Sequence, residues 1–138
     1  MVQTLDYTLQ EYRQDLGIIF FRWLMPADTE QLITGYTQVL ETTDFDTTHC
    51  WLFDTRRRGP ATAEAESWYF QTYIPRLVSL LQKPHYIAVL HTPTHFIHLR
   101  DVIGFDIFLK HTKGTLLTME FFESEQKAVE WLKATQEA

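Results

Sequence analysis

The 138-residue sequence is poor in cysteine, glycine and proline, with one, five and five residues of these types. A single cysteine excludes an internal disulfide. Because Cys50 lies in an apolar run with Trp51, Leu52 and Phe53, we predict that its thiol is buried as a small hydrophobic group. No repeat and no Pro/Gly/Ser-rich linker interrupts the chain, so we predict one domain over residues 1–138.

Positive charge and long apolar segments are also scarce. The net charge is -6, which disfavours nucleic acid and anionic membrane surfaces as partners. The longest apolar run, from Ile18 to Met25, is interrupted by Arg22 and is too short to cross a bilayer. Residues 1–12 contain neither the basic nor the apolar region of a signal peptide, so we predict a cytoplasmic protein without a membrane span.

The sequence lacks the motifs of nucleotide-binding and nucleophilic enzymes. It contains no Gly-x-Ser-x-Gly, no Gly-x-Gly-x-x-Gly and no Walker-type phosphate loop. Ser67, Ser79 and Ser124 each lie where a helix accounts for them, so no serine is placed as a nucleophile. We therefore predict a protein that is not an enzyme and that binds no cofactor.

Apolar and aromatic side chains are abundant, at 45% and 14% of the residues, which excludes a disordered chain. Their patterns predict strands over residues 5–12, 16–25, 49–53, 86–90 and 115–122. Helices are expected to begin near Asp28, Thr62, Thr94 and Ser124. We expect Pro75 to kink the second helix and Gly104 to end the third. The order β-β-α-β-α-β-α-β-α predicts an α/β fold with a five-stranded, mostly parallel (mixed) sheet and crossover helices.

The end of the chain carries the most distinctive motif. Phe53 and Asp54 end the central strand, and the last strand leads into Phe121, Phe122, Glu123, Ser124, Glu125, Ala128, Trp131 and Leu132. Together with the element order, this motif resembles the F-x-x-x-x-x-A-x-x-W-L ending of the STAS/SpoIIAA-like superfamily. The resemblance implies a bacterial regulatory or binding domain. Some members are anti-sigma-factor antagonists that bind partner proteins and are switched by serine phosphorylation, and other relatives resemble lipid-carrying SEC14-type domains.

The sequence departs from the antagonist pattern at the position of the phosphorylated serine. An Asp-Ser-Ser-Gly-like motif is expected at the start of the second helix, but residues 56–62 read Arg-Arg-Arg-Gly-Pro-Ala-Thr. Thr62 is the nearest hydroxyl by position, and we include it in the predicted ligand or partner site. The neighbouring arginines are unlike the usual phosphorylation switch, so regulation by that route is not expected.

Ligands of open α/β sheets bind beyond the carboxyl ends of the strands, which selects the loops after the third and fourth strands. The first of these loops contains Arg56, Arg57 and Arg58, the only cationic cluster in the chain. Beside a helix N-terminus, their guanidinium groups could bind phosphate, carboxylate or an acidic protein partner. The alternative is that an arginine pairs locally with Asp54 or Glu64 and the others are solvated.

The second loop leads to three histidines, His91, His95 and His98. On a helix, His95 and His98 share one face, which Asp101 continues. Three such side chains could bind zinc in a metal-dependent enzyme. Their spacing matches no known metal motif and no cysteine joins them, so we predict no metal site. We assign His91 and His95 to the ligand or partner site, with surface or capping histidines as the alternative.

Aromatic side chains form the third candidate surface. Trp68 and Tyr69 flank the apolar stripe of the second helix, and Phe105 and Phe108 follow Gly104. Exposed together, they would bind a protein partner, a lipid or a second copy of the chain in a homodimer. The alternative is ordinary core packing.

Three functions remain open from the sequence. The first is a non-enzymatic regulatory or protein-interaction domain, in which the arginines meet an acidic partner and Trp68 and Tyr69 are apolar anchors. The second is a small-molecule or lipid carrier whose ligand places an anionic head on the arginines. The third is a metal-dependent enzyme that uses His91, His95 and His98.

Overall fold

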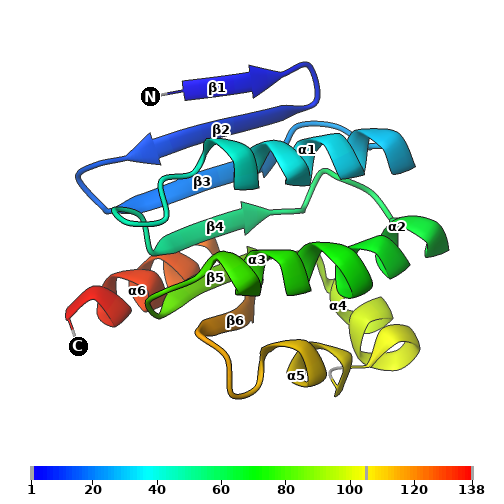
Figure 1. Cartoon of the computed structure of the whole chain (residues 1–138). Helices are drawn as coiled ribbons and strands as arrows, with labels where there is room; N and C mark the ends of the chain where they lie inside the picture. Colours follow the sequence, from blue (N-terminus) through cyan, green and yellow to red (C-terminus); the bar gives the residue numbers. More distant parts are fainter. Residues whose placement is uncertain (1, 105, 138) are drawn as a thin grey trace.

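The computed structural model describes residues 2–104 and 106–137, with their side chains except those of residues 2–4, 102, 103 and 107–109. A six-stranded sheet with strand order β1-β2-β3-β4-β5-β6 forms the centre of this part of the chain (Figure 1). β1, β2 and β3 pair antiparallel, whereas β3 to β6 are parallel. The strands are β1 (Val2–Leu5), β2 (Thr8–Arg13), β3 (Ile18–Trp23), β4 (Cys50–Asp54), β5 (His85–Leu90) and β6 (Leu117–Phe122).

The predicted α/β fold with a mixed sheet is confirmed, and the sheet has one more strand than expected. Apolar alternation over residues 5–12 predicted a single first strand. The chain instead turns at Asp6 and Tyr7, where Leu5 pairs with Thr8 and begins an antiparallel hairpin. The alternation continues through this tight turn, so the pattern alone did not reveal the break.

Helices cover both faces of the sheet (Figure 1). Because consecutive parallel strands are neighbours, right-handed crossovers return the connecting helices to the same face. That face packs β3 residues such as Phe21 and Trp23 against the helices between β3 and β5. The opposite face packs Phe20 and Leu52 against the last helix. The helices concerned are α1 (Thr29–Thr42), α2 (Ala63–Trp68) and α3 (Ile74–Leu80) on the first face and α6 (Glu125–Glu137) on the second.

The expected helix starts at Asp28, Thr62 and Ser124 are confirmed by their capping hydrogen bonds. Asp28 forms a complete capping box with Gln31. The Thr62 hydroxyl accepts from the backbone of residue 65, and the Ser124 hydroxyl accepts from that of residue 127. Each cap satisfies a backbone donor that the first turn of a helix leaves free.

The irregularity expected at Pro75 takes the form of a π-helical turn, η1 (Tyr69–Tyr73), between α2 and α3. The Ile74 amide donates to the Tyr69 carbonyl, five residues back. Pro75 then lies in the first turn of α3, where its missing N–H group needs no partner. The chain thus continues past the proline after one wider turn.

The segment after β5 differs from the prediction in its starting residue. Its first helix, α4 (Pro93–His98), is capped by Thr92 and not by Thr94. The Thr92 hydroxyl accepts from the His95 amide, and Pro93 takes the first helical position, which suits its fixed φ angle. A second π-helical turn, η2 (Leu99–Ile103), follows. It ends at Gly104, which adopts φ 86°, so the predicted end of this helix at the glycine is confirmed. A further helix, α5 (Asp106–Thr112), precedes β6.

The predicted burial of Cys50 is confirmed, since it is 1% exposed in the core between the sheet and α6. Burial raises the pKa of its thiol, although a contact with the Thr135 hydroxyl opposes this effect. Across the described residues, the helices are too short or too polar to cross a membrane.

Candidate functional site

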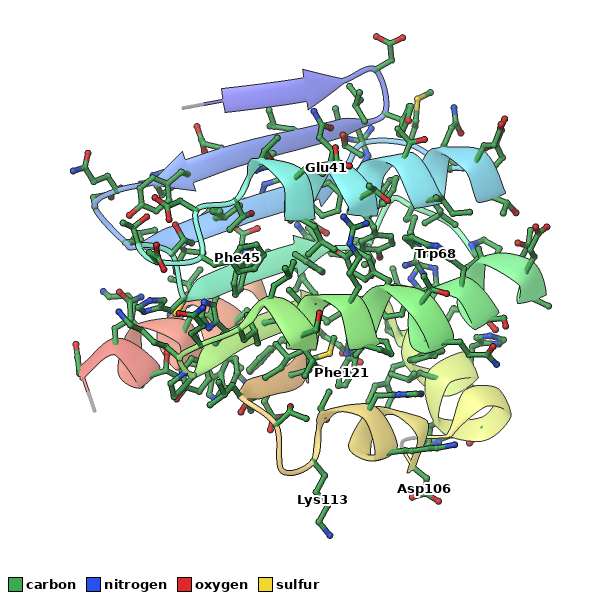
Figure 2. The ribbon with its side chains drawn as sticks, viewed as in Figure 1. Glu41, Phe45, Trp68, Asp106, Lys113 and Phe121 are labelled. Atoms are coloured by element: carbon green, nitrogen blue, oxygen red, sulfur yellow. The ribbon has the colours of Figure 1, made fainter. Side chains whose placement is uncertain are left out.

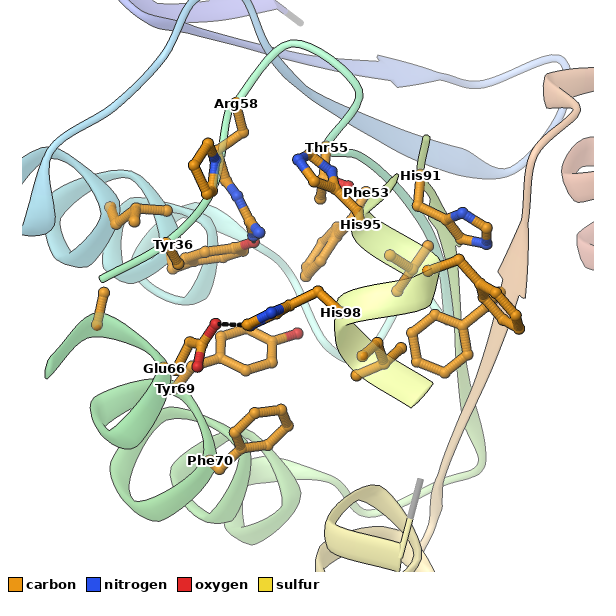
Figure 3. Close-up of a pocket in the computed structure, with 18 of the residues that line it drawn as sticks. Tyr36, Phe53, Thr55, Arg58, Glu66, Tyr69, Phe70, His91, His95 and His98 are labelled. Atoms are coloured by element: carbon orange, nitrogen blue, oxygen red, sulfur yellow. Dashed lines mark hydrogen bonds and ion pairs between the residues drawn. The ribbon is translucent and has the colours of Figure 1, made fainter. Parts of the chain in front are cut away.

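A cavity of about 240 Å³ opens at the carboxyl ends of β4 and β5, the edge predicted from the strand order. The first helical layer forms one wall through α1, α2 and η1, and α4 forms the opposite wall (Figure 3). Most of the lining side chains are aromatic or aliphatic. They are Leu32, Tyr36, Phe53, Thr55, Arg58, Pro60, Ala61, Ala65, Glu66, Trp68, Tyr69, Phe70, Val89, His91, Thr94, His95, Phe96, His98, Leu99 and Phe121.

Arg58 is the arginine of the predicted cluster that reaches this cavity. A turn brings it there, since the Arg58 amide donates to the Thr55 carbonyl at 3.2 Å and its own carbonyl accepts from the Ala27 amide. Nη1 donates to the Tyr36 hydroxyl at 2.8 Å, and Nε makes a longer contact of 3.4 Å with the Gly59 carbonyl. No described carboxylate forms an ion pair with this half-buried guanidinium.

Arg56 has a different place, in an ion-pair network beside the N-terminus of α6. Its Nε and Nη2 atoms contact the two carboxylate oxygens of Asp54 at 3.0 and 2.9 Å. Arg22 and Glu125 complete the network through Arg22 Nη1, which lies 2.9 Å from Asp54 and 2.6 Å from Glu125. Local pairing with Asp54, one of the alternatives from the sequence, therefore holds for Arg56.

Burial acts to raise the pKa of Asp54, but the hydrogen bonds and charge of Arg56, with Arg22, outweigh it and lower that pKa below its usual value. The network therefore holds Asp54 ionised. Arg57, the third arginine, is exposed, and no ion pair joins it to any described side chain. The three arginines thus do not form one cationic surface.

The three histidines all line the cavity but do not converge on one point. His91 is buried, bonds the Thr92 carbonyl through Nδ1 at 3.0 Å and stacks on Phe96. His98 instead bonds Glu66. Among the described residues, no group of three or more His, Cys, Asp or Glu side chains is placed to hold a metal ion. The alternative of a metal site at His91, His95 and His98 gains no support from the described residues, because His91 and His98 bond different partners.

His95 lies near Arg58, whose positive charge acts on its ring. Burial lowers its pKa below the usual value, and the positive charge of Arg58 and of the neighbouring histidines lowers it further. Its Nδ1 atom is buried and has no hydrogen-bond partner. His95 is consequently neutral at pH 7.

A hydrogen bond between His98 and Glu66 links the two walls at the edge of the cavity. His98 Nε2 lies 2.6 Å from Glu66 Oε1 and joins α4 to α2, as the dashed line in Figure 3 shows. Since a carboxylate can only accept, the His98 nitrogen donates. Both side chains remain partly exposed, at 46% and 23%, so this contact lies at the solvent side of the cavity.

Trp68 and Tyr69 are walls of the cavity and parts of a larger aromatic cluster. Tyr36 lies 6.5 Å from Trp68 and 5.1 Å from Tyr69 between ring centroids. Figure 2 shows Trp68 between α1 and α2, whereas Lys113 extends into solvent. Both side chains are partly buried and pack against the core, which is the alternative predicted for them. Phe105 lies outside the described residues, as does the side chain of Phe108.

Thr62 is outside the cavity lining and has a structural role at the start of α2. Its hydroxyl accepts from the Ala65 amide at 3.1 Å and lies 2.6 Å from the Thr29 hydroxyl. These contacts tie the starts of α1 and α2 together. A ligand- or partner-binding role for Thr62 stays a prediction.

Sequence reasoning missed several residues that complete the cavity, among them Tyr36, Thr55 and Glu66. Tyr36 belonged to the apolar stripe of α1, and Glu66 suited the first turn of α2 as an acid. Nothing in the sequence around Tyr36 or Glu66 indicated a functional role. Thr55 alone was recognisable, because it directly follows a buried strand at the edge where ligands bind.

Comparison with known proteins supports the architecture. No family model matches the chain, and no curated protein matches it either. Among solved structures, an uncharacterized protein from the DUF3478 family of Shewanella loihica PV-4, described as having a SpoIIAA-like fold, matches with a TM-score of 0.55. The match covers 96% of this chain and 90% of that protein at 14% sequence identity. The chain therefore has a SpoIIAA-like fold.

Proposed function

We propose that the protein is a non-enzymatic binding domain that holds a small, largely apolar molecule in the cavity between α1, α2 and α4. The observation that carries this proposal is the cavity itself. Aromatic and aliphatic side chains such as Phe53, Phe70 and Val89 form most of its surface, with few polar groups among them. Pockets of this composition are typical of small-molecule sites.

The volume limits the size of the ligand. At about 30 Å³ per water molecule in the liquid, 240 Å³ corresponds to roughly eight waters. A compact molecule of roughly ten non-hydrogen atoms fills such a space. Transfer of its apolar surface from water would provide the favourable free energy of binding. A long-chain lipid would extend beyond this volume, so the proposal takes a small molecule as the ligand.

The polar groups at the cavity favour binding over catalysis. The Thr55 hydroxyl donates to the Leu90 carbonyl at 2.9 Å, which leaves it poorly placed as a nucleophile. His91 and His98 are held by contacts with a carbonyl and a carboxylate. This arrangement suits fixed walls that orient a ligand.

Fragment binding observed by NMR tests the proposal. Indole and toluene, added separately to the ¹⁵N-labelled protein, should shift the backbone amides of Val89 and Phe70, which line the cavity. Ala61→Trp should abolish these shifts by filling the space, whereas Ser67→Trp, on the exposed side of α2, should leave them unchanged. Shifts confined to residues outside the cavity, or equal shifts in both variants, would contradict the proposal.

A second function, regulation through a protein partner, is favoured by the surface around Arg57. Arg57 is exposed, and the Ala27 amide bonds the Arg58 carbonyl, which places the loop containing Met25 beside this turn. Met25 is 48% exposed. An exposed arginine next to an apolar side chain suits contact with an acidic protein. Arg57→Glu should abolish capture of such a partner in pull-downs, with Arg76→Glu on α3 as the control.

A further inference from the structure

Several hydrogen-bond donors that line the cavity have no acceptor among the described residues. Arg58 is the clearest case. A guanidinium has five N–H groups. The contacts with Tyr36 and Gly59 use only two of them, one N–H of Nη1 and the N–H of Nε. The remaining N–H groups have no acceptor among the described residues, although the side chain is half-buried.

The tyrosine hydroxyls add further donors. Because Tyr36 accepts from Arg58, its own proton points elsewhere, and no described residue accepts it. Burial raises the pKa of Tyr69 well above its usual value, so its hydroxyl also keeps its proton. Figure 3 shows both rings with Arg58 around the same hollow. A ligand there meets N–H and O–H groups.

His95 adds a polar atom without a partner, since its Nδ1 is buried and makes no hydrogen bond. With its proton on Nε2, the neutral ring would donate to a ligand from that atom. Two acceptors at the cavity already have donors: Glu66 accepts from His98, and the Leu90 carbonyl accepts from Thr55.

We propose that the ligand is a compact aromatic or branched monocarboxylate whose carboxylate accepts from Arg58 and the Tyr36 hydroxyl. This inference rests on the proposed function and specifies its ligand. A carboxylate offers two acceptor oxygens in the plane that a guanidinium fork matches. It also supplies the negative charge that Arg58 lacks among the described side chains.

A singly charged ligand fits better than a phosphate ester. Arg58 is the only arginine or lysine that lines the cavity among the described residues, and His95 is neutral. A dianion would bring a second negative charge close to Glu66, which also lines the cavity. That charge would have no cation to compensate it. The monocarboxylate matches the single positive charge of Arg58, which has no ion-pair partner among the described residues.

Calorimetric titration at pH 7.5 with matched ligands tests the ligand class. Phenylacetate and phenylacetamide have the same size, and phenyl phosphate is a dianion at this pH because its second pKa is about 6. The wild-type protein should bind phenylacetate about tenfold or more tighter than phenylacetamide, the change expected from one charge-assisted hydrogen bond. Phenyl phosphate should bind more weakly than phenylacetate.

Variants of Arg58 test whether this residue causes the preference for phenylacetate over phenylacetamide. Arg58→Gln should reduce the ratio of the two affinities to about threefold or less, and Arg58→Lys should restore part of it because the charge is kept. Arg57→Gln is the matched control, from the neighbouring exposed position, and should keep the wild-type ratio. Thermal unfolding of each variant verifies that it folds.

The outcomes separate this inference from the proposed function. If indole binds in the cavity but phenylacetate has no advantage over phenylacetamide, or if Arg58→Gln keeps the advantage, the carboxylate assignment is wrong and the binding function stands. Tighter binding of phenyl phosphate would also overturn the assignment. If neither indole, toluene nor phenylacetate binds, both proposals fail.

Discussion

Arg56, Arg57 and Arg58 are consecutive in sequence, yet each has different surroundings because they lie in a tight turn. The Arg56 amide donates to Asp54 Oδ1, and the Arg58 amide donates to the Thr55 carbonyl, so the backbone reverses within a few residues. The turn directs Arg56 to the network near α6 and Arg58 into the cavity on the other side of the sheet. Adjacent identical side chains therefore lie in different places: Arg56 in an ion-pair network, and Arg58 in the lining of the cavity proposed to bind a ligand.

Asp54 is the residue on which the network depends, since it is 6% exposed and bonds both Arg22 and Arg56. Asp54→Asn removes the charge and leaves two arginines without their main partner. Because both arginines reach water, we expect a loss of about 1–2 kcal/mol in the free energy of unfolding at pH 7. Urea denaturation of both proteins measures this difference.

The pH dependence gives the same prediction a second test. The pKa of Asp54 is lowered in the folded state, so the unfolded chain binds more protons as the solution becomes acidic. Its stabilising effect is complete above the unfolded pKa of about 4 and is lost as the pH falls through the folded value. The difference in the free energy of unfolding between the wild type and Asp54→Asn should therefore become smaller below about pH 4. Asp15→Asn, at the exposed pair with Arg13, is the control and should leave the urea midpoint unchanged. A constant difference down to pH 2.5 would contradict this prediction.

At the scale of elements, the two π-helical turns both occur where the chain passes the cavity. η1 contributes Tyr69 and Phe70 to its wall, and η2 contributes Leu99. A π turn inserts one residue into the helical repeat and rotates everything beyond it. The 3.6-residue pattern used on the sequence therefore loses its register at these positions, which is why Trp68 and Tyr69 looked like side chains beside the core stripe.

Helix α1 packs closely on β3, and Gly35 is the point of contact. A Cβ atom added there would lie 2.6 Å from the ring of Trp23, a buried side chain with no room to move. Gly35→Ala should lower the free energy of unfolding by up to about 2 kcal/mol, because the overpacking cost of about 1–3 kcal/mol is offset by a gain in helix propensity of about 1 kcal/mol. Thr34→Ala, at the exposed neighbouring position, should be neutral or slightly stabilising. Chemical denaturation distinguishes the two, and a more stable Gly35→Ala protein would refute the close packing.

The contact of His98 with Glu66 links α4 to α2. An exposed pair of this kind contributes up to about 1 kcal/mol, which is a factor of about five in a local opening equilibrium. His98→Ala should therefore increase hydrogen exchange of the α4 amides by up to about fivefold while α6 is unaffected. Exchange measured by mass spectrometry resolves these segments. Arg100→Ala, which breaks only an exposed contact with Asp101, should leave α4 exchange as in the wild type.

At the scale of the whole molecule, the sequence predicted the architecture because alternating strand and helix patterns permit few topologies. The buried runs of β4 and β5 and the caps at Asp28, Thr62 and Ser124 were all readable locally. The cavity was predictable only as a location, at the carboxyl ends of the strands. Its lining depends on which way a turn points Arg58 and on helix positions such as Tyr36 and Glu66, and these are consequences of three-dimensional packing.

Ligand binding should be visible as a change in the stability of the whole domain, because the cavity is formed by elements from both halves of the chain. A ligand that binds only the folded state at a concentration of about 100 times its Kd adds about 2.7 kcal/mol to the free energy of unfolding. For a chain of 138 residues, this raises Tm by about 9 °C. Phenylacetate should produce this shift in the wild-type protein and in Arg57→Gln, but a much smaller one at the same concentration in Arg58→Gln. Since the unfolded chain has no cavity, an equal shift in all three proteins would mean that phenylacetate acts elsewhere on the folded surface, and the carboxylate site at Arg58 would have to be abandoned.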